Sequence, residues 1–161
     1  MYPSQPKREI SAGVIIYRRT GEGPKFLILY HGSSYWNFPK GKIAEGERSF
    51  RAALREVWEE TGLGQRDLGF SDQFKVRDQF TFVRNRQKIF KTVTYYLAET
   101  RNPSIRLLIK PDQVSGEKHE GYGWFLYRDA MRILKAQNLR NSLKKAYELI
   151  SKKNLPPRQK K

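Results

Sequence analysis

The apolar positions of this chain fall into short runs rich in β-branched and aromatic residues, separated by polar or glycine-containing turns. Runs of this length and composition are typical of strands. The stretch KTVTYYLAE also alternates in the way expected of a strand with one buried face. The predicted strands are residues 10–18, 26–30, 70–83, 88–99 and 121–126, with residues 105–109 as an ambiguous sixth candidate.

Three other segments are predicted to be helical, at residues 49–61, 128–136 and 139–151. The first of them lacks Gly and Pro and is rich in Ala, Leu, Arg and Glu, which are all good helix formers. Strands and helices in this order predict an α/β or α+β fold, in which a mixed sheet is sandwiched between helices.

The predicted helix 49–61 has recognisable ends and a buried face. Ser49 is a suitable N-cap, and Gly62 is a suitable stop because glycine adopts the left-handed conformation without strain. The residues predicted to be buried are Phe50, Ala53, Leu54 and Val57.

Three glutamates lie on another face of the same helix. At about 100° per residue, Glu56, Glu59 and Glu60 fall within roughly 100° of one another. Three carboxylates that close repel one another unless a cation lies between them, and hard oxygen ligands suit Mg²⁺ or Mn²⁺. The alternative from the residues alone is a solvated acidic face paired with Arg51 and Arg55.

Composition sets broad limits on the protein. Its 161 residues predict one domain, at residues 1–150, followed by a basic and disordered tail at 151–161 that holds five basic residues and no acidic one. No apolar run is long enough for a membrane span, and the N-terminus lacks the apolar core of a signal peptide. The absence of cysteine excludes disulfides and thiolate metal sites and fits a cytoplasmic location.

The formal net charge is +16, from 32 basic and 16 acidic residues. Such a surface attracts polyanions, which include nucleotides, RNA and anionic membranes. Of these, a nucleotide or RNA is the expected partner, and a membrane is not. The alternative is a lysine-rich surface that serves only solubility. Neither reading predicts whether the chain is a monomer or a dimer.

The residues around the three glutamates complete a longer pattern. It runs Gly41, five residues, Glu47, seven residues, Arg55-Glu56-Val57, one residue, Glu59-Glu60, one residue and Gly62-Leu63. This pattern resembles the Nudix box at every defined position. The resemblance favours the metal-binding interpretation over the solvated acidic face, and it implies the Nudix fold, a mixed sheet between helices.

Three further segments are similar to parts of the diadenosine polyphosphate hydrolases of that family. They are WNFPKG at 36–41, KTVTYYLA at 91–98 and HEGYGW at 119–124, which resemble W-x-x-P-K-G, K-x-V-x-Y-F-L-A and H-x-x-Y-x-W. The sequence FPKGK at 38–42 also resembles messenger-RNA decapping enzymes. The substrate implied by the resemblance is therefore open between a dinucleotide and an RNA 5′ end.

The resemblance also implies a metal centre that holds Mg²⁺ or Mn²⁺. Glu56 and Glu60 are expected to ligate the ion, with Glu59 as a third ligand or as the general base. The carbonyl oxygen of Gly41 is expected to complete the set. Catalysis would then be attack of a metal-activated water on phosphorus.

Supporting roles are implied for other residues of the pattern. Glu47 and Arg55 are expected to hold the loop and helix in position around the ligands. Glu120 is expected to supply a further catalytic carboxylate, and His119 to contact phosphate or transfer a proton. His31 has no predicted role.

Substrate binding is expected to involve lysines and tyrosines. Lys40 and Lys91 are candidates for the polyphosphate, and Tyr95 and Tyr122 for stacking on adenine. The ordinary alternatives are a solvated lysine and an aromatic residue packed on a strand. The neighbouring aromatic residues 35 and 36 are weaker candidates for stacking.

The leading functional prediction is metal-dependent, asymmetric hydrolysis of diadenosine polyphosphates with release of ATP. The alternatives are removal of pyrophosphate or a cap from RNA 5′ ends, and hydrolysis of oxidised nucleoside triphosphates. A non-catalytic binding module is disfavoured because the glutamates of the pattern are all present.

Overall fold

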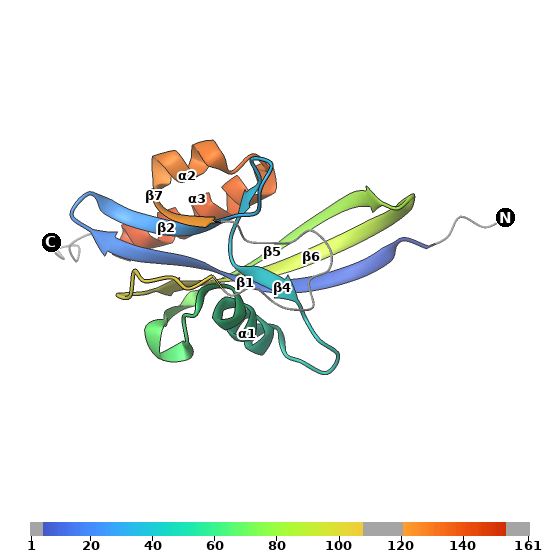
Figure 1. The fold of residues 1–161 in the computed structure, drawn as a ribbon, viewed down its shortest axis with the longest axis horizontal. Helices are drawn as coiled ribbons and strands as arrows, with labels where there is room; N and C mark the ends of the chain where they lie inside the picture. The colour runs from blue at the N-terminus through green and yellow to red at the C-terminus, as the bar shows by residue number, and fades with distance from the viewer. Residues whose placement is uncertain (1–4, 108–120, 154–161) are drawn as a thin grey trace, which may run out of the picture.

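The computed structural model describes residues 5–107 and 121–153. Within these residues the chain forms a seven-stranded sheet, three α-helices and one 3-10 helix (Figure 1). The strands are β1 (Lys7–Thr20), β2 (Gly23–Tyr30), β3 (Trp36–Asn37), β4 (Lys40–Lys42), β5 (Gly69–Arg84), β6 (Gln87–Glu99) and β7 (Gly121–Leu126). The helices are α1 (Ser49–Thr61), η1 (Gln65–Asp67), α2 (Tyr127–Ile133) and α3 (Gln137–Lys153).

The sheet is mixed. Its main order is β3-β2-β1-β6-β5, while β4 pairs with β1 and β7 pairs with β2. The central pair, β1 and β6, is parallel, and the other pairs are antiparallel. The predicted fold class is therefore confirmed, with α1 on one side of the sheet and α2 and α3 on the other (Figure 1).

Alternation along β1 divides the core into two layers, because successive side chains of a strand point to opposite faces. Ile15 and Tyr17 pack in the layer that includes residues of α2 and α3. Val14 and Ile16 pack in the layer that includes Val57 of α1. Both faces of the central strand are buried, which explains its almost continuous apolar sequence.

The N-terminal halves of β1 and β6 and the C-terminal half of β5 continue past the helices as a three-stranded ribbon (Figure 1). The turn between β5 and β6 has only two residues, Asn85 and Arg86, with φ of 51° and 62°. Two positive φ values suit a two-residue hairpin turn that matches the twist of the strands. This turn sets the register in which Arg84 pairs with Gln87.

The structure confirms the predicted extent of α1 and its stop at Gly62, which has φ of 75° and donates its N–H to the Trp58 carbonyl oxygen. The predicted cap at Ser49 is wrong. The helix begins at Ser49, the preceding Arg48 is the N-cap without a side-chain hydrogen bond, and the Ser49 hydroxyl accepts a hydrogen bond from Tyr96.

Other boundaries differ from the predictions by a few residues. Residues 105–107 of the ambiguous sixth strand are not in a strand, and residues 108–109 lie outside the described residues. Helix α3 continues through Lys153, where the tail was expected to have begun, and residues 154–161 also lie outside the described part.

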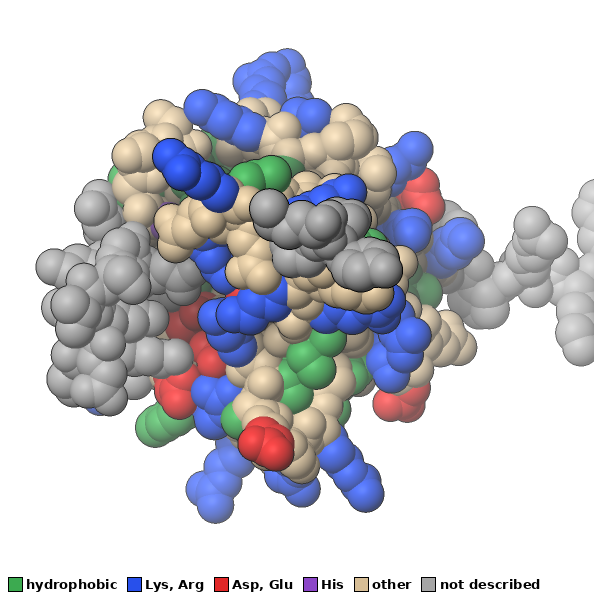
Figure 2. Space-filling model, turned by 90° about the vertical axis from the view of Figure 1, so that its right-hand side faces the viewer, with side chains coloured by type: hydrophobic (Ala, Val, Ile, Leu, Met, Phe, Trp, Pro, Cys, Tyr) green, Lys and Arg blue, Asp and Glu red, His purple; other side chains and the backbone are tan. Residues whose placement is uncertain are grey.

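Lysine and arginine side chains cover much of the face shown in Figure 2 and do not gather in a single patch. No helix of residues 5–107 and 121–153 is long and apolar enough to span a membrane.

Candidate active site

Arg55 of α1 ties the helix to the loop that precedes it. Its Nε and Nη2 atoms donate to the two oxygens of Glu47, each at 2.9 Å, and Nη2 also donates to the Lys42 carbonyl oxygen at 2.9 Å. The Ala44 amide donates to Glu47 as well, at 3.0 Å. The hydrogen bonds from Arg55 and Ala44 lower the pKa of Glu47 from 4.5 to about 2, so this carboxylate is ionised at neutral pH.

The same guanidinium group reaches two predicted metal ligands. Arg55 Nη1 donates to Glu56 Oε1 at 2.8 Å and lies 3.2 and 3.3 Å from the Glu59 oxygens. The hydrogen bond to Glu47 is the largest of the influences that raise the pKa of Arg55, so its charge is permanent. The contacts needed for the predicted supporting role of Glu47 and Arg55 are present.

Strand β4 brings the backbone against the other side of these carboxylates. The Lys40 amide donates to Glu60 Oε2 at 3.0 Å. At Gly41, a Cβ atom would lie 2.0 Å from Glu56 Cδ and within 2.4 Å of both its oxygens. Only glycine leaves room for the Glu56 carboxylate at this point, where the Glu56 side chain is 6% exposed.

This donor set has the chemistry for Mg²⁺ or Mn²⁺, since it consists of three carboxylates and the carbonyl oxygen of Gly41. The space kept open by Gly41 fits that interpretation. Among the described residues, no three acidic or imidazole groups are arranged to hold one ion as they stand. Arg55 donates to Glu56 and Glu59, and the Lys40 amide donates to Glu60, so each of the three carboxylates is already held by a hydrogen bond.

A cavity of about 490 Å³ begins at Glu60 and runs over the ribbon face that lies on the α3 side of the sheet. It is lined by His31, Tyr35, Asn37, Lys40, Glu60, Phe80, Phe82, Arg84, Lys91, Val93, Tyr95, Ala136, Asn138 and Leu139. The structure thus brings together Lys40, Lys91 and Glu60, three of the predicted site residues. Aromatic side chains and cations next to a box glutamate suit a ligand with both a base and phosphates.

The two predicted stacking tyrosines are placed differently from the expectation. Tyr95 lines the cavity, but its ring is 1% exposed and packs edge-on against Phe38, so neither ring face is open to a base. Burial raises the pKa of Tyr95 well above its ordinary value. Tyr122 is exposed on β7 opposite Leu29 and is not among the residues that line the cavity. His119 and Glu120 lie outside the described residues.

Sequence reasoning missed several residues of the cavity. Phe80 and Phe82 alternate on β5, and Phe80 pairs directly with Lys91, so they lie on the same face of the sheet as that lysine. The sequence shows that Phe80 and Phe82 are two residues apart and so share a face of their strand. It does not show the strand register that places Phe80 opposite Lys91. His31, which had no predicted role, and Tyr35, a weaker stacking candidate, form another part of the wall, with ring centroids 5.2 Å apart.

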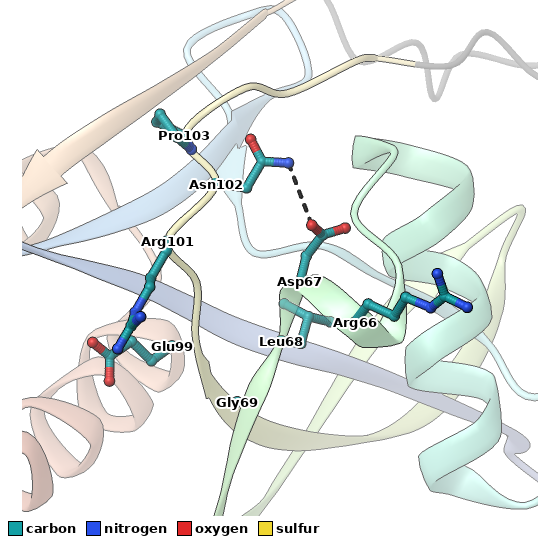
Figure 3. Close-up of a pocket in the computed structure, with 8 residues that line it drawn as sticks. All are labelled: Arg66, Asp67, Leu68, Gly69, Glu99, Arg101, Asn102 and Pro103. Carbon is teal, nitrogen blue, oxygen red and sulfur yellow. Dashed lines mark hydrogen bonds between the residues drawn. The ribbon is translucent and has the colours of Figure 1, made fainter.

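A second hollow, of about 740 Å³, lies beside η1 and the end of β6 (Figure 3). An Asn102–Asp67 hydrogen bond crosses it, and Arg66 and Arg101 point to opposite sides. None of the predicted site residues lines it. Its size alone gives no reason to prefer it as the active site.

Comparisons with known proteins identify the family of the chain. The asymmetrical bis(5′-nucleosyl)-tetraphosphatase of Mus musculus is 28% identical over 148 residues, which are 87% of this chain and 94% of the relative. A solved structure of a Caenorhabditis elegans Ap4A hydrolase binary complex has a TM-score of 0.72 and 26% identity, and covers 89% of this chain and 98% of that one.

An RNA pyrophosphohydrolase of Edwardsiella ictaluri is 36% identical, but over only 61 residues, which are 36% of this chain and 32% of the relative. The family model described as the NUDIX domain matches residues 7–149. Since that match spans most of the chain and the box is intact, the chain belongs to the Nudix family and is a pyrophosphohydrolase of that family.

Proposed function

We propose that this protein hydrolyses a pyrophosphate linkage in diadenosine polyphosphates, asymmetrically and with release of ATP. The observation that carries the proposal is a single cavity in which the box glutamate Glu60, the cations Lys40 and Lys91 and the aromatic wall of Phe80 and Tyr35 meet. A base and a polyphosphate chain need these groups together. The names of the mouse and nematode relatives support the same substrate class.

The residues of the box would hold the metal. Glu56, Glu60 and the Gly41 carbonyl oxygen are the proposed ligands, with Glu59 as a further ligand or as the base that accepts a proton from the attacking water. When bound, the ion would activate that water and neutralise charge on the phosphates. Arg55 orients two of these carboxylates by direct hydrogen bonds.

Phosphate binding is assigned to the lysines at the box end of the cavity. An ammonium group binds phosphate without strict geometry. Lys40 and Lys91 can therefore stay in contact with the polyphosphate while negative charge develops on it during the reaction. In this proposal the buried Tyr95 only packs beneath the cavity. Base stacking is assigned to the half-buried ring of Phe80.

The test is a side-by-side hydrolysis assay with Mg²⁺ on diadenosine tetraphosphate, 5′-triphosphorylated RNA and 8-oxo-dGTP. Rapid release of ATP from the dinucleotide, abolished by EDTA and by Glu59→Gln, is the expected result. Glu45→Gln is a matched control, because Glu45 is an exposed residue of the loop before α1. An intact dinucleotide beside a cleaved alternative substrate would refute the assignment.

Removal of pyrophosphate from an RNA 5′ end is the second candidate. The net charge of +16 favours it, because neutralising RNA phosphates releases counterions and strengthens binding. The RNA pyrophosphohydrolase relative matches little beyond a third of the chain, which is weaker support than the dinucleotide relatives give. Faster turnover of the RNA than of the dinucleotide would reverse the order.

A further inference from the structure

Two cations, Lys42 of β4 and Arg84 of β5, surround a buried carboxylate outside the Nudix box. The carboxylate belongs to Glu9 of β1, whose side chain is 5% exposed. Arg84 Nη2 donates to Glu9 Oε1, and Lys42 Nζ lies 3.9 Å from the same oxygen. We call Glu9, Lys42 and Arg84 the outer charge cluster.

Glu9 is the buried member of this cluster and fixes the positions of the two cations. Burial on its own would raise the pKa of Glu9, but the hydrogen bond from Arg84 and the charges of Lys42, Arg84 and Lys91 together lower it. A buried carboxylate that is ionised and paired keeps its cationic partners in a defined position, since breaking the pair would leave a buried charge without compensation. The other oxygen, Oε2, is buried and makes no hydrogen bond to any residue that the structure describes.

The two cations still face outward. The Arg84 side chain is 45% exposed and the Lys42 side chain 70% exposed, so both have donors left for a ligand. One carboxylate against two cations leaves the cluster with net positive charge. Lys91 adds to that field, since it pairs with Glu9 in the parallel register of β1 and β6 and lies on the same face.

The outer charge cluster lies next to both the cavity and the Nudix box. Arg84 lines the same cavity as Phe82 and Lys91, and the Lys42 carbonyl oxygen accepts the hydrogen bond from Arg55. The tight turn at Asn85 and Arg86 directly follows Arg84 and fixes where β5 ends. Four elements, β1, β4, β5 and β6, therefore converge on one patch of positive charge.

We propose that Lys42 and Arg84 form a second anion subsite, which binds the phosphates that extend beyond those held by Lys40 and Lys91, with Glu9 as their positioning residue. The subsite rests on the proposed function, and it would set the preference for the number of bridging phosphates. We expect a chain of three phosphates to end before the subsite and a chain of five or six to reach it. Longer diadenosine polyphosphates should gain affinity from Arg84 that the triphosphate does not.

The first test measures kcat and KM for diadenosine tri-, tetra-, penta- and hexaphosphate. Arg84→Ala should raise KM for the penta- and hexaphosphate about tenfold, the factor expected for a lost charge-assisted hydrogen bond, and change the triphosphate little. Arg84→Lys should restore part of the loss. Arg77→Ala is the matched control, because Arg77 is an exposed arginine on the same strand but on the opposite face.

Glu9→Gln separates positioning from a purely structural role. It should reproduce the chain-length profile of Arg84→Ala with kcat preserved, and the double variant should be no worse than Arg84→Ala alone, because both changes act on one interaction. An equal loss for every chain length, together with a lower Tm, would instead show that Glu9 only stabilises the fold and would overturn its positioning role.

A calorimetric measurement with a linear inorganic polyphosphate of six phosphates, made without metal, keeps the subsite separate from the proposed function. Weaker binding in Arg84→Ala than in Arg77→Ala would support the subsite even if the wild-type protein cleaves no diadenosine polyphosphate, an outcome that would refute only the proposed function. Cleavage with an unchanged chain-length profile in Arg84→Ala, and equal binding of the six-phosphate probe, would overturn the subsite.

Discussion

Gly41 is a single position where one added carbon atom would displace a proposed metal ligand. In Gly41→Ala the Cβ atom would collide with the Glu56 carboxylate, at 2.0 Å from its Cδ. We expect kcat/KM to fall by at least about tenfold, the lower range for disturbing the surroundings of a metal ligand. Overpacking should also destabilise the fold by about 1–3 kcal/mol.

The matched control for that substitution is Gly21→Ala, since a Cβ atom at Gly21 meets no heavy atom within 4 Å. Steady-state kinetics and thermal unfolding of both variants are the measurements. Wild-type activity in a folded Gly41→Ala protein would show that Glu56 does not need its observed position.

Glu47 has a pH dependence that follows from its pairing with Arg55. Its pKa is lowered from 4.5 to about 2, so its contribution to the free energy of unfolding is fully present above pH 4.5 and is lost as the pH falls toward 2. We expect wild type to exceed Glu47→Gln in stability at neutral pH, with the difference vanishing near pH 2. Urea unfolding at several pH values measures it, and a carboxyl titration midpoint at 4.5 would contradict the Arg55 contact.

At the scale of an element, Gly62 ends helix α1 in the left-handed conformation, which residues with a Cβ atom adopt only with strain. Its φ is 75°, and an added Cβ atom would lie 3.2 Å from Arg106 Cβ. Gly62→Ala should therefore cost about 1–2 kcal/mol, which lowers Tm by about 2–8 °C in a protein of this size. Gly64→Ala is the control, because Gly64 has φ of −93° and only ordinary contacts. Equal Tm values for the two variants would contradict the strain argument.

The elements of this fold were more predictable than the contacts between them. Helix α1 was predicted to the residue, because composition and the glycine stop are local signals. The contribution of Phe82 and Arg84 to the cavity was not predictable, since it depends on a register between β5 and β6 that pattern alone does not set. Ser49 failed as a cap because Tyr96, distant in sequence, binds its hydroxyl.

In the candidate site, too, some features could be predicted from the sequence and others could not. Short, contiguous motifs were enough to single out the box, Lys40 and Lys91, and the structure brings Lys40 and Lys91 to the same cavity as Glu60, while their roles stay predictions. Tyr95 was expected to stack on a base, yet the parallel pairing of β1 with β6 buries its ring in the core. Short motifs predicted the chemistry of the site, while the long-range pairing of strands determines which side chains surround it.

At the scale of the whole molecule, the net charge is +16, and lysine and arginine side chains are spread over the face shown in Figure 2 and are not confined to the cavity. Charge of this kind acts at long range, raising the encounter rate with an anionic substrate at low ionic strength. It should lose that effect as the screening length falls from about 10 Å at 0.1 M salt to about 3 Å at 1 M. Bound phosphates near Lys40, Lys91 and Arg84 should be less sensitive to salt because they are partly enclosed.

The double variant Lys144→Glu/Lys145→Glu on the exposed face of α3 separates the two contributions, because neither lysine lines the cavity. We expect kcat/KM for diadenosine tetraphosphate to fall about threefold in low salt, with kcat unchanged, and to match wild type at 1 M salt. Arg84→Ala should differ, since its loss for long substrates is expected to persist at high salt. A loss of kcat/KM in the α3 variant that persists at 1 M salt would mean that α3 contacts the substrate directly. Equal kinetics of the variant and wild type at all salt concentrations would mean that the distributed charge does not steer the substrate at all.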